Sequence, residues 1–303
     1  MELKVVHGLV AGEGSPVCRG TIAVASHTLK RMSTPVNPKT FDAETYGPWA
    51  LIVGGSEGVG AEIAFRLADR GVSSVLVARK TGPLEETAEA VRARGVDCRI
   101  VPVDLTEPGA TATIAEACEG LDLGLLVLNA GANTYGCEFV EADMAQVQKV
   151  IDLNITSPMQ IIRQFGPGLT ARGRGGIVVM GSMAGYLGHA DMSIYSAAKA
   201  FSRVFVEGLW LEMREHGVDV VEVILGVTRT PAMIRAGLDM DLPGMTVSEP
   251  AEVAEEVLAS IGAGPVHVCG GEGNRKGVEF SSGVDRGRIV AGAHKRMKAL
   301  RGN

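Results

Sequence analysis

The sequence lacks any cysteine pattern that would hold a metal ion or a disulfide framework. It has five cysteines in 303 residues, and they form neither a CxxC pair nor a Cys/His spacing typical of metal ligands. These cysteines are Cys18, Cys98, Cys118, Cys137 and Cys269. We therefore expect reduced thiols, most of them buried, and no metal site.

Long apolar runs and an excess of positive charge are absent as well. No run of about eighteen apolar residues occurs, which argues against a membrane-spanning helix. The first residues carry Glu2, Lys4 and Glu13 and lack the continuous apolar core of a secretion signal. The formal net charge of -6 argues against a surface that binds nucleic acid. These absences favour a cytoplasmic protein.

The composition is typical of a soluble globular protein with a substantial core, since hydrophobic residues make up 46% of the chain and charged residues 21%. We expect one domain over residues 45–285, followed by a basic tail at residues 286–303. Residues 1–44 show no sustained periodicity and are punctuated by glycine and proline, so we expect a weakly ordered or partly packed extension. This extension could alternatively fold over a neighbouring subunit, and Met32 could be the biological start.

Short apolar runs alternate with amphipathic helical patterns along most of the chain. This alternation predicts a Rossmann-type α/β fold, a doubly wound and mainly seven-stranded parallel sheet with helices on both faces. The expected strands are residues 50–53, 75–78, 98–103, 125–128, 177–180, 218–225 and 266–269. One long helix is expected over residues 144–162, and further helices are expected over residues 84–94, from Tyr195 onward, over residues 250–261 and over residues 286–301.

A glycine-rich turn follows the first expected strand and opens a helix. It reads Gly54-Gly55-Ser56-Glu57-Gly58-Val59-Gly60. Glycine lets a backbone approach a pyrophosphate closely, and the first N–H groups of a helix can hold the phosphates. Because a strand precedes the turn and a helix follows it, the turn is a candidate dinucleotide site.

The most informative stretch runs from Ser182 to Lys199. Tyr195 and Lys199 are four residues apart in a helical pattern, which puts the phenol and the ammonium on one face. A positive charge about 4 Å away could lower the pKa of a phenol by roughly three units before desolvation opposes it. Ser182, at the end of an apolar strand, could hold a substrate oxygen beside the phenol. Alternatively, a tyrosine and a lysine at this spacing form an ordinary amphipathic surface pair.

Ser182 lies thirteen residues before Tyr195, and with the upstream glycine turn the chain resembles the short-chain dehydrogenase/reductase family. The family's active site is a Ser, a Tyr and a Lys at this spacing together with an Asn, and its glycine turn reads TGxxxGxG. The resemblance implies that Ser182, Tyr195, Lys199 and Asn154 are catalytic, with Asn154 holding a water in the proton path through Lys199. Outside that family, an Asn within a helix is an ordinary polar residue. Val53 replaces the usual threonine of the glycine motif, which removes one hydroxyl that would brace the turn.

The resemblance also implies which residues bind the cofactor. They are Gly54, Ser56, Glu57, Gly58, Val59, Gly60, Arg79, Lys80, Asp104, Leu105, Asn129, Ala130, Gly131, Tyr195, Lys199, Gly226, Val227, Thr228 and Thr230. Asp104 would border the adenine, although it could instead cap a turn. Thr230 would meet the nicotinamide amide, but Leu225 stands where the family commonly has a proline, which loosens the turn.

Arg79 and Lys80 directly follow the second expected strand. An acid near this strand end usually takes the ribose hydroxyls of NAD, whereas a cation accommodates the 2′-phosphate of NADP. We therefore expect NADP(H) as the preferred cofactor. NAD(H) is the alternative, because the two cations could be merely solvated and Glu57 would not help to bind an extra phosphate.

Residues 232–250 combine methionines with glycines, and we expect a mobile flap over the site. Several methionines in such a segment suggest an adaptable apolar wall, although any one of them could simply pack on the core. The candidate substrate contacts are Ser182, Met183, His189, Met192, Tyr195 and Met233. No particular role is assigned to His189.

Together these features predict an oxidoreductase that reduces a ketone or aldehyde, or oxidises a secondary alcohol, on a largely apolar small molecule. The segment Tyr46-Gly47-Pro48-Trp49 and the glycine turn are loosely similar to long-chain 3-oxoacyl and steroid reductases. A homodimer or homotetramer is expected by resemblance. One alternative, an epimerase or dehydratase of the same superfamily, would need a sizeable added substrate domain. The other, a non-catalytic dinucleotide sensor, would tolerate the loss of Tyr195.

Overall fold

The computed structural model describes residues 41–241, 245–284 and 286–300, all within the unit that runs from Asn37 to the C-terminus. The predicted extension at residues 1–44 therefore lies outside the described residues as far as residue 40. The described chain opens with the short helix α1 (Ala43–Tyr46), which leads into the first strand.

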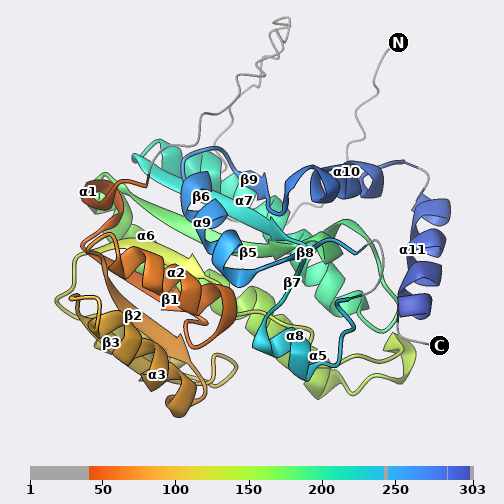
Figure 1. The fold of residues 1–303 in the computed structure, drawn as a ribbon, viewed down its shortest axis with the longest axis horizontal. Coiled ribbons are helices and arrows are strands. Elements are labelled where there is room, and N and C mark those ends of the chain that lie inside the picture. Colours follow the sequence, from red (N-terminus) through yellow and green to blue (C-terminus); the bar gives the residue numbers. More distant parts are fainter. Residues whose placement is uncertain (1–40, 242–244, 285, 301–303) are drawn as a thin grey trace, which may run out of the picture. The chain divides into compact units, whose positions relative to one another are not determined.

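Seven strands form one parallel sheet, which confirms the predicted α/β fold (Figure 1). Their order is β3-β2-β1-β4-β5-β6-β9, and the order reverses between β1 and β4, where doubly wound folds bind their ligands. The strands are β1 (Trp49–Val53), β2 (Ser73–Ala78), β3 (Cys98–Pro102), β4 (Leu123–Leu128), β5 (Gly175–Ser182), β6 (Val218–Leu225) and β9 (Val266–Val268).

Helices cover both faces of this sheet. Ala50 and Ile52 join an apolar cluster with α2, α3 and α9, whereas Leu51 and Val53 join a second cluster with α4, α6 and α7. Burial on both faces explains why the strands are continuous apolar runs. The helices are α2 (Gly58–Ala68), α3 (Thr81–Arg92), α4 (Ala110–Ala117), α5 (Met144–Ile151), α6 (Ser157–Arg172), α7 (Ser193–Arg214), α9 (Pro250–Ser260), α10 (Gly271–Ser281) and α11 (Arg286–Leu300). Two 3₁₀ turns are η1 (Phe139–Glu141) and η3 (Met183–Tyr186).

The long helix predicted over residues 144–162 is present, and it continues to Arg172. It contains a π-helical turn, η2 (Asp152–Thr156), between α5 and α6, which the prediction did not include. Pro158 stands at the start of α6 and has no N–H, so the carbonyl group of Asn154 cannot receive the usual helical hydrogen bond. A π turn of this kind is a frequent feature of functional sites, and this one carries Asn154.

The segment predicted as a flap, residues 232–250, contains regular structure. It includes most of α8 (Pro231–Arg235) and the short strand β8 (Val247–Ser248), which pairs with β7 (Val227–Thr228). Arg229 donates to Asp241 at 3.0 Å and to Glu249 at 3.1 Å, and so links both sides of the segment. Residues 242–244 lie outside the described part of the chain, and the mobility of the flap stays a prediction.

The described cysteines are free, as expected, and Cys98, Cys118 and Cys269 are buried. Cys137 is partly exposed, and Cys18 lies outside the described residues. Within the described ranges, no helix is both long and apolar enough to cross a bilayer.

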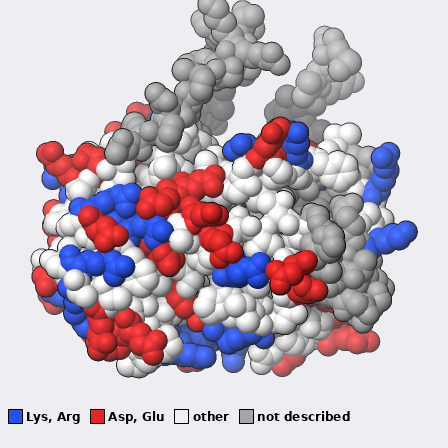
Figure 2. All heavy atoms as spheres, in the orientation of Figure 1, with Lys and Arg blue, Asp and Glu red and all other residues white. Residues whose placement is uncertain are grey.

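Positive and negative side chains are interspersed on the face of the molecule that carries α2 and α9 (Figure 2). Arg66 on α2 pairs with Glu62 and, at 3.0 Å, with Glu255 on α9. Arg70 adds a second contact with Glu255 at 2.8 Å. These pairs tie two helices together over the sheet and leave little unbalanced charge on this face.

Candidate active site

Four strands end at the same edge of the sheet, and predicted site residues lie at or just after these strand ends. Because β1, β4, β5 and β6 are parallel, their carboxyl ends lie side by side. Gly54 follows β1, Asn129 follows β4, Ser182 ends β5 and Gly226 follows β6. Residues that are far apart in the sequence are therefore brought together at this edge.

The glycine turn is closed so tightly that side chains cannot fit at two of its positions. Gly54 has φ of +90°, and a Cβ atom there would lie 2.6 Å from the backbone nitrogen of Ala130. A Cβ atom on Gly60 would overlap the carbonyl oxygen of Gly54. The side chain of Asn129 donates to that same oxygen at 2.8 Å and holds the turn in place.

The start of α2 fits the phosphates of a dinucleotide. The helix begins at Gly58, and its N-cap residue Glu57 makes no side-chain hydrogen bond to the first turn. The first N–H groups of α2 are thus left for a ligand, and the positive end of the helix dipole favours an anion. Ser56 is tied to α3 through its carbonyl oxygen, which accepts from Thr87 at 3.0 Å, while Val59 packs into the core.

Tyr195 and Lys199 lie on one face of α7, as their spacing predicts. The Lys199 Nζ atom is 5.8 Å from the centroid of the Tyr195 ring, and it donates to the Met180 carbonyl at 2.8 Å. The expected lowering of the phenol's pKa is not found. Burial raises the pKa of Tyr195, and a hydrogen bond with Ser182 only partly opposes this effect. Burial also lowers the pKa of Lys199 to about 8, with a nearby charge on Glu222 acting in the opposite direction.

Ser182 lies between strand β5 and the 3₁₀ turn η3. Its hydroxyl oxygen accepts a hydrogen bond from the Ala184 N–H at 3.2 Å and so caps η3. The same hydroxyl group is a hydrogen-bond partner of Tyr195. The serine and the phenol can therefore share one substrate oxygen.

Asn154 is 4% exposed and points its amide towards Lys199. Its Nδ2 atom donates to the carbonyls of Ala132 at 3.0 Å and Val150 at 2.9 Å. Its Oδ1 atom is buried and has no hydrogen-bond partner among the described residues. A Cβ atom on Gly131 would lie 2.9 Å from both this Oδ1 atom and the Lys199 Nζ atom, so both groups lie beside Gly131 without a hydrogen bond between them.

The residues expected near the adenine have partners within the protein. Asp104 accepts from the backbone N–H and the hydroxyl of Thr106 at 2.9 and 2.8 Å, so it caps a turn. Arg79 is exposed and lies 3.9 Å from Asp104, and Lys80 is exposed at the start of α3. The carbonyl of Leu105 accepts from Ser157 at 2.7 Å.

The chain that leaves β6 passes close to the glycine turn. A Cβ atom on Gly58 would lie 3.1 Å from the methyl carbon of Thr230, whose hydroxyl caps α8. Arg235 on α8 forms a two-pronged ion pair with Glu57. Val227 and Thr228 lie in β7, and Gly226 is packed so closely against Asn274 that a Cβ atom would lie 2.5 Å from its amide nitrogen.

The comparison with protein families decides the identity of the fold. A family model described as short chain dehydrogenase matches residues 48–240, which is more than half of the chain. The chain belongs to the short-chain dehydrogenase family. It is therefore an oxidoreductase.

Named relatives agree with this assignment. The chain is 28% identical to the 7beta-hydroxysteroid dehydrogenase of Clostridium sardiniense over 249 residues, which are 82% of this chain and 95% of that protein. It is 29% identical to the very-long-chain 3-oxoacyl-CoA reductase of Podospora anserina over 221 residues, 71% of this chain and 64% of that protein. A solved short-chain dehydrogenase from Sphingobium yanoikuyae in complex with NADPH has a TM-score of 0.65 at 33% identity, covering 73% of this chain and 87% of that one.

The predicted substrate contacts of this short-chain dehydrogenase lie on several different segments of the described chain. Met183 in η3 reaches α10, since a Cβ atom on Gly277 would lie 2.8 Å from its terminal methyl group. Met192 lines a hollow with Tyr135, Phe139 and Ile194, and this hollow includes neither Ser182 nor Tyr195. Met233 on α8 is 40% exposed, and His189 lies in the loop before α7.

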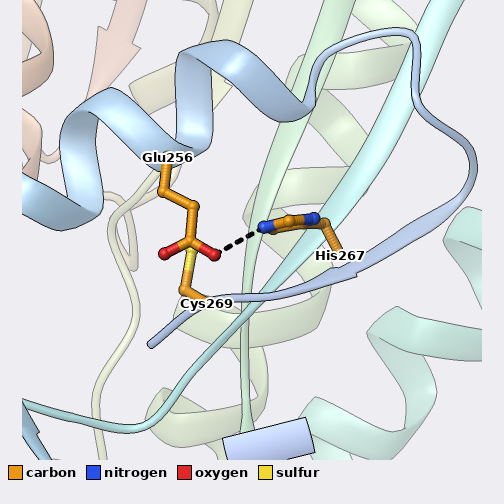
Figure 3. A group of neighbouring side chains, drawn as sticks. All are labelled: Glu256, His267 and Cys269. Carbon is orange, nitrogen blue, oxygen red and sulfur yellow. Dashed lines mark hydrogen bonds and ion pairs between the residues drawn. The ribbon is translucent and has the colours of Figure 1, made fainter. Parts of the chain in front are cut away.

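Sequence reasoning missed a group of three side chains that could hold a metal ion in this short-chain dehydrogenase (Figure 3). The ligand atoms of Glu256, His267 and Cys269 lie within 4.8 Å of one another. The Glu256 carboxylate already accepts hydrogen bonds from the His267 ring at 2.9 Å and from the Gly270 N–H at 3.1 Å. Burial raises the pKa of the Cys269 thiol, and the nearby Glu256 carboxylate raises it further. The hydrogen bonds of this group therefore link α9 to the end of β9. The only sequence signal was the two-residue spacing of His267 and Cys269, which puts both on one face of a strand.

Sequence reasoning also missed Glu222, a buried acid in β6. A charged residue within an apolar strand is the signal that could have found it, because such a residue is rarely fully buried without a partner.

Proposed function

We propose that this chain is an NADP(H)-dependent oxidoreductase that interconverts a ketone or aldehyde with a secondary alcohol, acting through Ser182, Tyr195, Lys199 and Asn154. The observation that carries the proposal is the meeting of these side chains beyond the carboxyl edge of the sheet. Ser182 forms a hydrogen bond with Tyr195, while the Lys199 Nζ atom and the Oδ1 atom of Asn154 both lie beside Gly131. The cradle formed by Gly54 and Gly60 lies at the same edge.

Each side chain has a role that its surroundings support. The nicotinamide, when bound, gives or accepts the hydride, and the protein supplies position and proton transfer. The Ser182 hydroxyl holds the substrate oxygen, and Tyr195 donates the proton to that oxygen during reduction. A phenol whose pKa is raised by burial keeps its proton until the oxygen becomes basic enough to take it. The unpartnered Oδ1 atom of Asn154 is suited to a water molecule that links Lys199 to solvent.

Replacing Tyr195 by phenylalanine tests this assignment. We expect Tyr195→Phe to lower turnover by about 10²- to 10⁴-fold, because the proton donor is lost. Affinity for NADPH, measured by fluorescence titration, should stay nearly unchanged. An active variant would rule out the phenol as the acid, and a wild type that binds nucleotide without turning over any carbonyl or alcohol would favour the sensor alternative.

The preference for NADP(H) over NAD(H) rests on Arg79 and Lys80. Both side chains are exposed at the end of β2, where the adenosine ribose lies in doubly wound folds. Glu57, which would oppose an extra phosphate, is neutralised by Arg235. The solved relative from Sphingobium yanoikuyae was obtained with NADPH, which agrees with this choice.

The variant Arg79→Ala tests the cofactor preference. It should weaken NADPH by about 10- to 100-fold, since a hydrogen bond to a charged group contributes about 1.5–3 kcal/mol. Its effect on NADH should be much smaller. The control Lys276→Ala removes an exposed cation on α10 and should change neither affinity. Equal losses for both nucleotides would overturn the preference.

The substrate is proposed to be a bulky apolar ketone or alcohol. Met183, Met192 and Met233 lie on three different segments around the site and offer an adaptable apolar wall. The named relatives act, by their names, on a hydroxysteroid and on very-long-chain 3-oxoacyl-CoA. A panel of hydroxysteroids, 3-oxoacyl thioesters and small ketones, followed by absorbance of the reduced cofactor, tests this class. Turnover confined to small polar carbonyls would contradict it.

A homodimer or homotetramer in the cytoplasm completes the proposal. The outer face of α7 carries Phe201, Val204 and Leu211, which are 40%, 59% and 57% exposed. These three residues and Gly208 are spaced so that they share one face of the helix. Gly208 borders open space, since nothing lies within 4 Å of the position where its Cβ atom would be. Such an apolar stripe is suited to packing against a second copy of the same helix.

A further inference from the structure

Glu222 is a fully buried acidic residue of β6, the strand next to the edge strand β9. It lies in β6, is 0% exposed and has Val179 of β5 and Val266 of β9 as its neighbours in register. A carboxylate without full hydrogen bonding is costly at such a position. Its presence there calls for a physical explanation that packing alone does not give.

The hydrogen bonds of Glu222 are incomplete. Its Oε1 atom is bonded to the hydroxyl of Ser202 on α7, and its buried Oε2 atom has no hydrogen-bond partner among the described residues. The Ser202 hydroxyl also lies 3.0 Å from the Lys199 carbonyl. Since the hydroxyl has one proton, it donates either to the backbone carbonyl of Lys199 or to the ionised carboxylate of Glu222. When it donates to Lys199, Glu222 must be protonated in order to donate to Ser202.

Glu222 and Lys199 contact two adjacent residues of β5, Gly181 and Met180 respectively. A Cβ atom on Gly181 would lie 2.7 Å from the carboxyl carbon of Glu222, so the carboxyl group packs directly against that glycine. Lys199 donates to the carbonyl of Met180, the preceding residue. Ser182 follows immediately. The buried acid therefore lies behind the strand end that carries the candidate active-site serine.

The charges around Glu222 come mainly from α7. Burial raises the pKa of Glu222 to about 7, while Ser202, Lys199 and Arg203 act in the opposite direction and Glu207 adds a small rise. Tyr186 of η3 also feels the charge of Glu222. The register neighbours on β5 and β9 are apolar. Lys199 is the buried cation of this group, and the two buried charges stabilise each other.

We propose that Glu222 is a positioning residue of the candidate active site, which keeps Lys199 charged and thereby couples proton transfer at this site to pH. When Glu222 is ionised, its negative charge favours the ammonium form of Lys199. When Glu222 is protonated or replaced by an amide, Lys199 loses that support and releases its proton at lower pH. The functional part of this proposal rests on the role proposed above for Lys199.

A double-mutant cycle measured by thermal denaturation tests the charge coupling without substrate or cofactor. It compares the wild type with Glu222→Gln, Lys199→Met and the double variant at pH 5 and pH 7.5. We expect a coupling of about 1–2 °C in Tm at pH 7.5, the shift that about 1 kcal/mol produces in a chain of 303 residues. At pH 5 the coupling should vanish, because Glu222 is then protonated. Equal coupling at both pH values, or none, would overturn the proposal.

The pH dependence of stability gives a second readout. The folded-state pKa of Glu222 is raised from 4.5 to about 7, so ionisation destabilises the folded wild type as pH rises through this range. The Tm of Glu222→Gln minus that of the wild type should therefore grow between pH 5 and pH 7 and then level off. The control Glu212→Gln alters an exposed acid on α7, and its difference should stay flat. A flat difference for Glu222→Gln would also contradict the proposal.

The pH profile of NADPH affinity links the pair to the site. Affinity should fall on the alkaline side as Lys199 loses its proton, and Glu222→Gln should move this fall to lower pH by about one unit. Binding with an unchanged profile in Glu222→Gln would overturn the proposal. A wild type that binds neither NADPH nor NADH would contradict the proposed function instead, while the cycle still decides whether Glu222 holds the charge of Lys199.

Discussion

Gly131 shows how one residue without a side chain keeps the candidate site assembled. The Asn154 amide oxygen and the Lys199 ammonium both lie 2.9 Å from the point where its Cβ atom would be. Real Cβ contacts at this distance require one partner to move. Both neighbouring atoms are at the ends of side chains, so an alanine at this position could be accommodated if these side chains moved. That movement would change the geometry of the candidate site.

Gly131→Ala should therefore impair catalysis more than folding. We expect turnover to fall by about 100-fold, the effect of misplacing a reacting group by roughly 1 Å. The Tm should change little, and NADPH affinity should change less than turnover. Gly168→Ala on α6 is the control, because no atom lies within 4 Å of its Cβ position and alanine suits a helix. Full activity in Gly131→Ala would show that Asn154 and Lys199 need not meet there.

The chemistry of single residues was only partly predictable from the sequence. Their spacing predicted that Tyr195 and Lys199 share one helical face, and in the structure the Lys199 Nζ atom lies 5.8 Å from the centroid of the Tyr195 ring. The pKa of Tyr195 is raised where the sequence predicted a lowering, because burial, a property of the tertiary structure, outweighs the hydrogen bond with Ser182. Asp104 was left between two roles; its hydrogen bonds with Thr106 confirm that it caps a turn, and its place beside the adenine stays a prediction.

At the scale of elements, the sheet was predictable, and the π turn between α5 and α6 was not. Strands buried on both faces produce continuous apolar runs, which mark their positions well. Residues 144–162 keep a helical apolar period across the π turn, so the pattern does not reveal it. Pro158 was the available signal, since a proline within a helical pattern removes one hydrogen bond.

The contact between α8 and the start of α2 joins the predicted flap to the candidate cofactor site. Arg235 neutralises Glu57 beside the helix terminus that would hold the phosphates. Without Arg235, the Glu57 carboxylate would repel an anionic ligand. Because both side chains are accessible to solvent, water and salt screen this repulsion and the effect should be small.

Arg235→Ala should therefore weaken NADPH by up to about fivefold, and added salt should reduce the effect. The double variant Glu57→Gln with Arg235→Ala removes both charges and should restore most of the affinity. Fluorescence titration of NADPH at two ionic strengths measures both effects. Failure of the double variant to recover would show that Arg235 acts through the position of α8 and not through the charge of Glu57.

At the scale of the whole molecule, the apolar stripe on α7 connects assembly with the candidate site. The same helix carries Tyr195 and Lys199 on its inner face and Phe201, Val204 and Leu211 on its outer face. Packing a second copy on the outer face would steady the helix that holds the reacting groups. Assembly and activity should then depend on each other.

Val204→Asp should break this association, since a carboxylate would be buried without a partner in the contact. Light scattering coupled to size exclusion should show a smaller species than the wild type, with lower turnover and a lower Tm. Val284→Asp is the matched control, because Val284 is 98% exposed between α10 and α11 and its replacement should leave the mass unchanged. A wild type that is already monomeric, or a Val204→Asp variant of unchanged mass, would show that the α7 stripe does not join subunits.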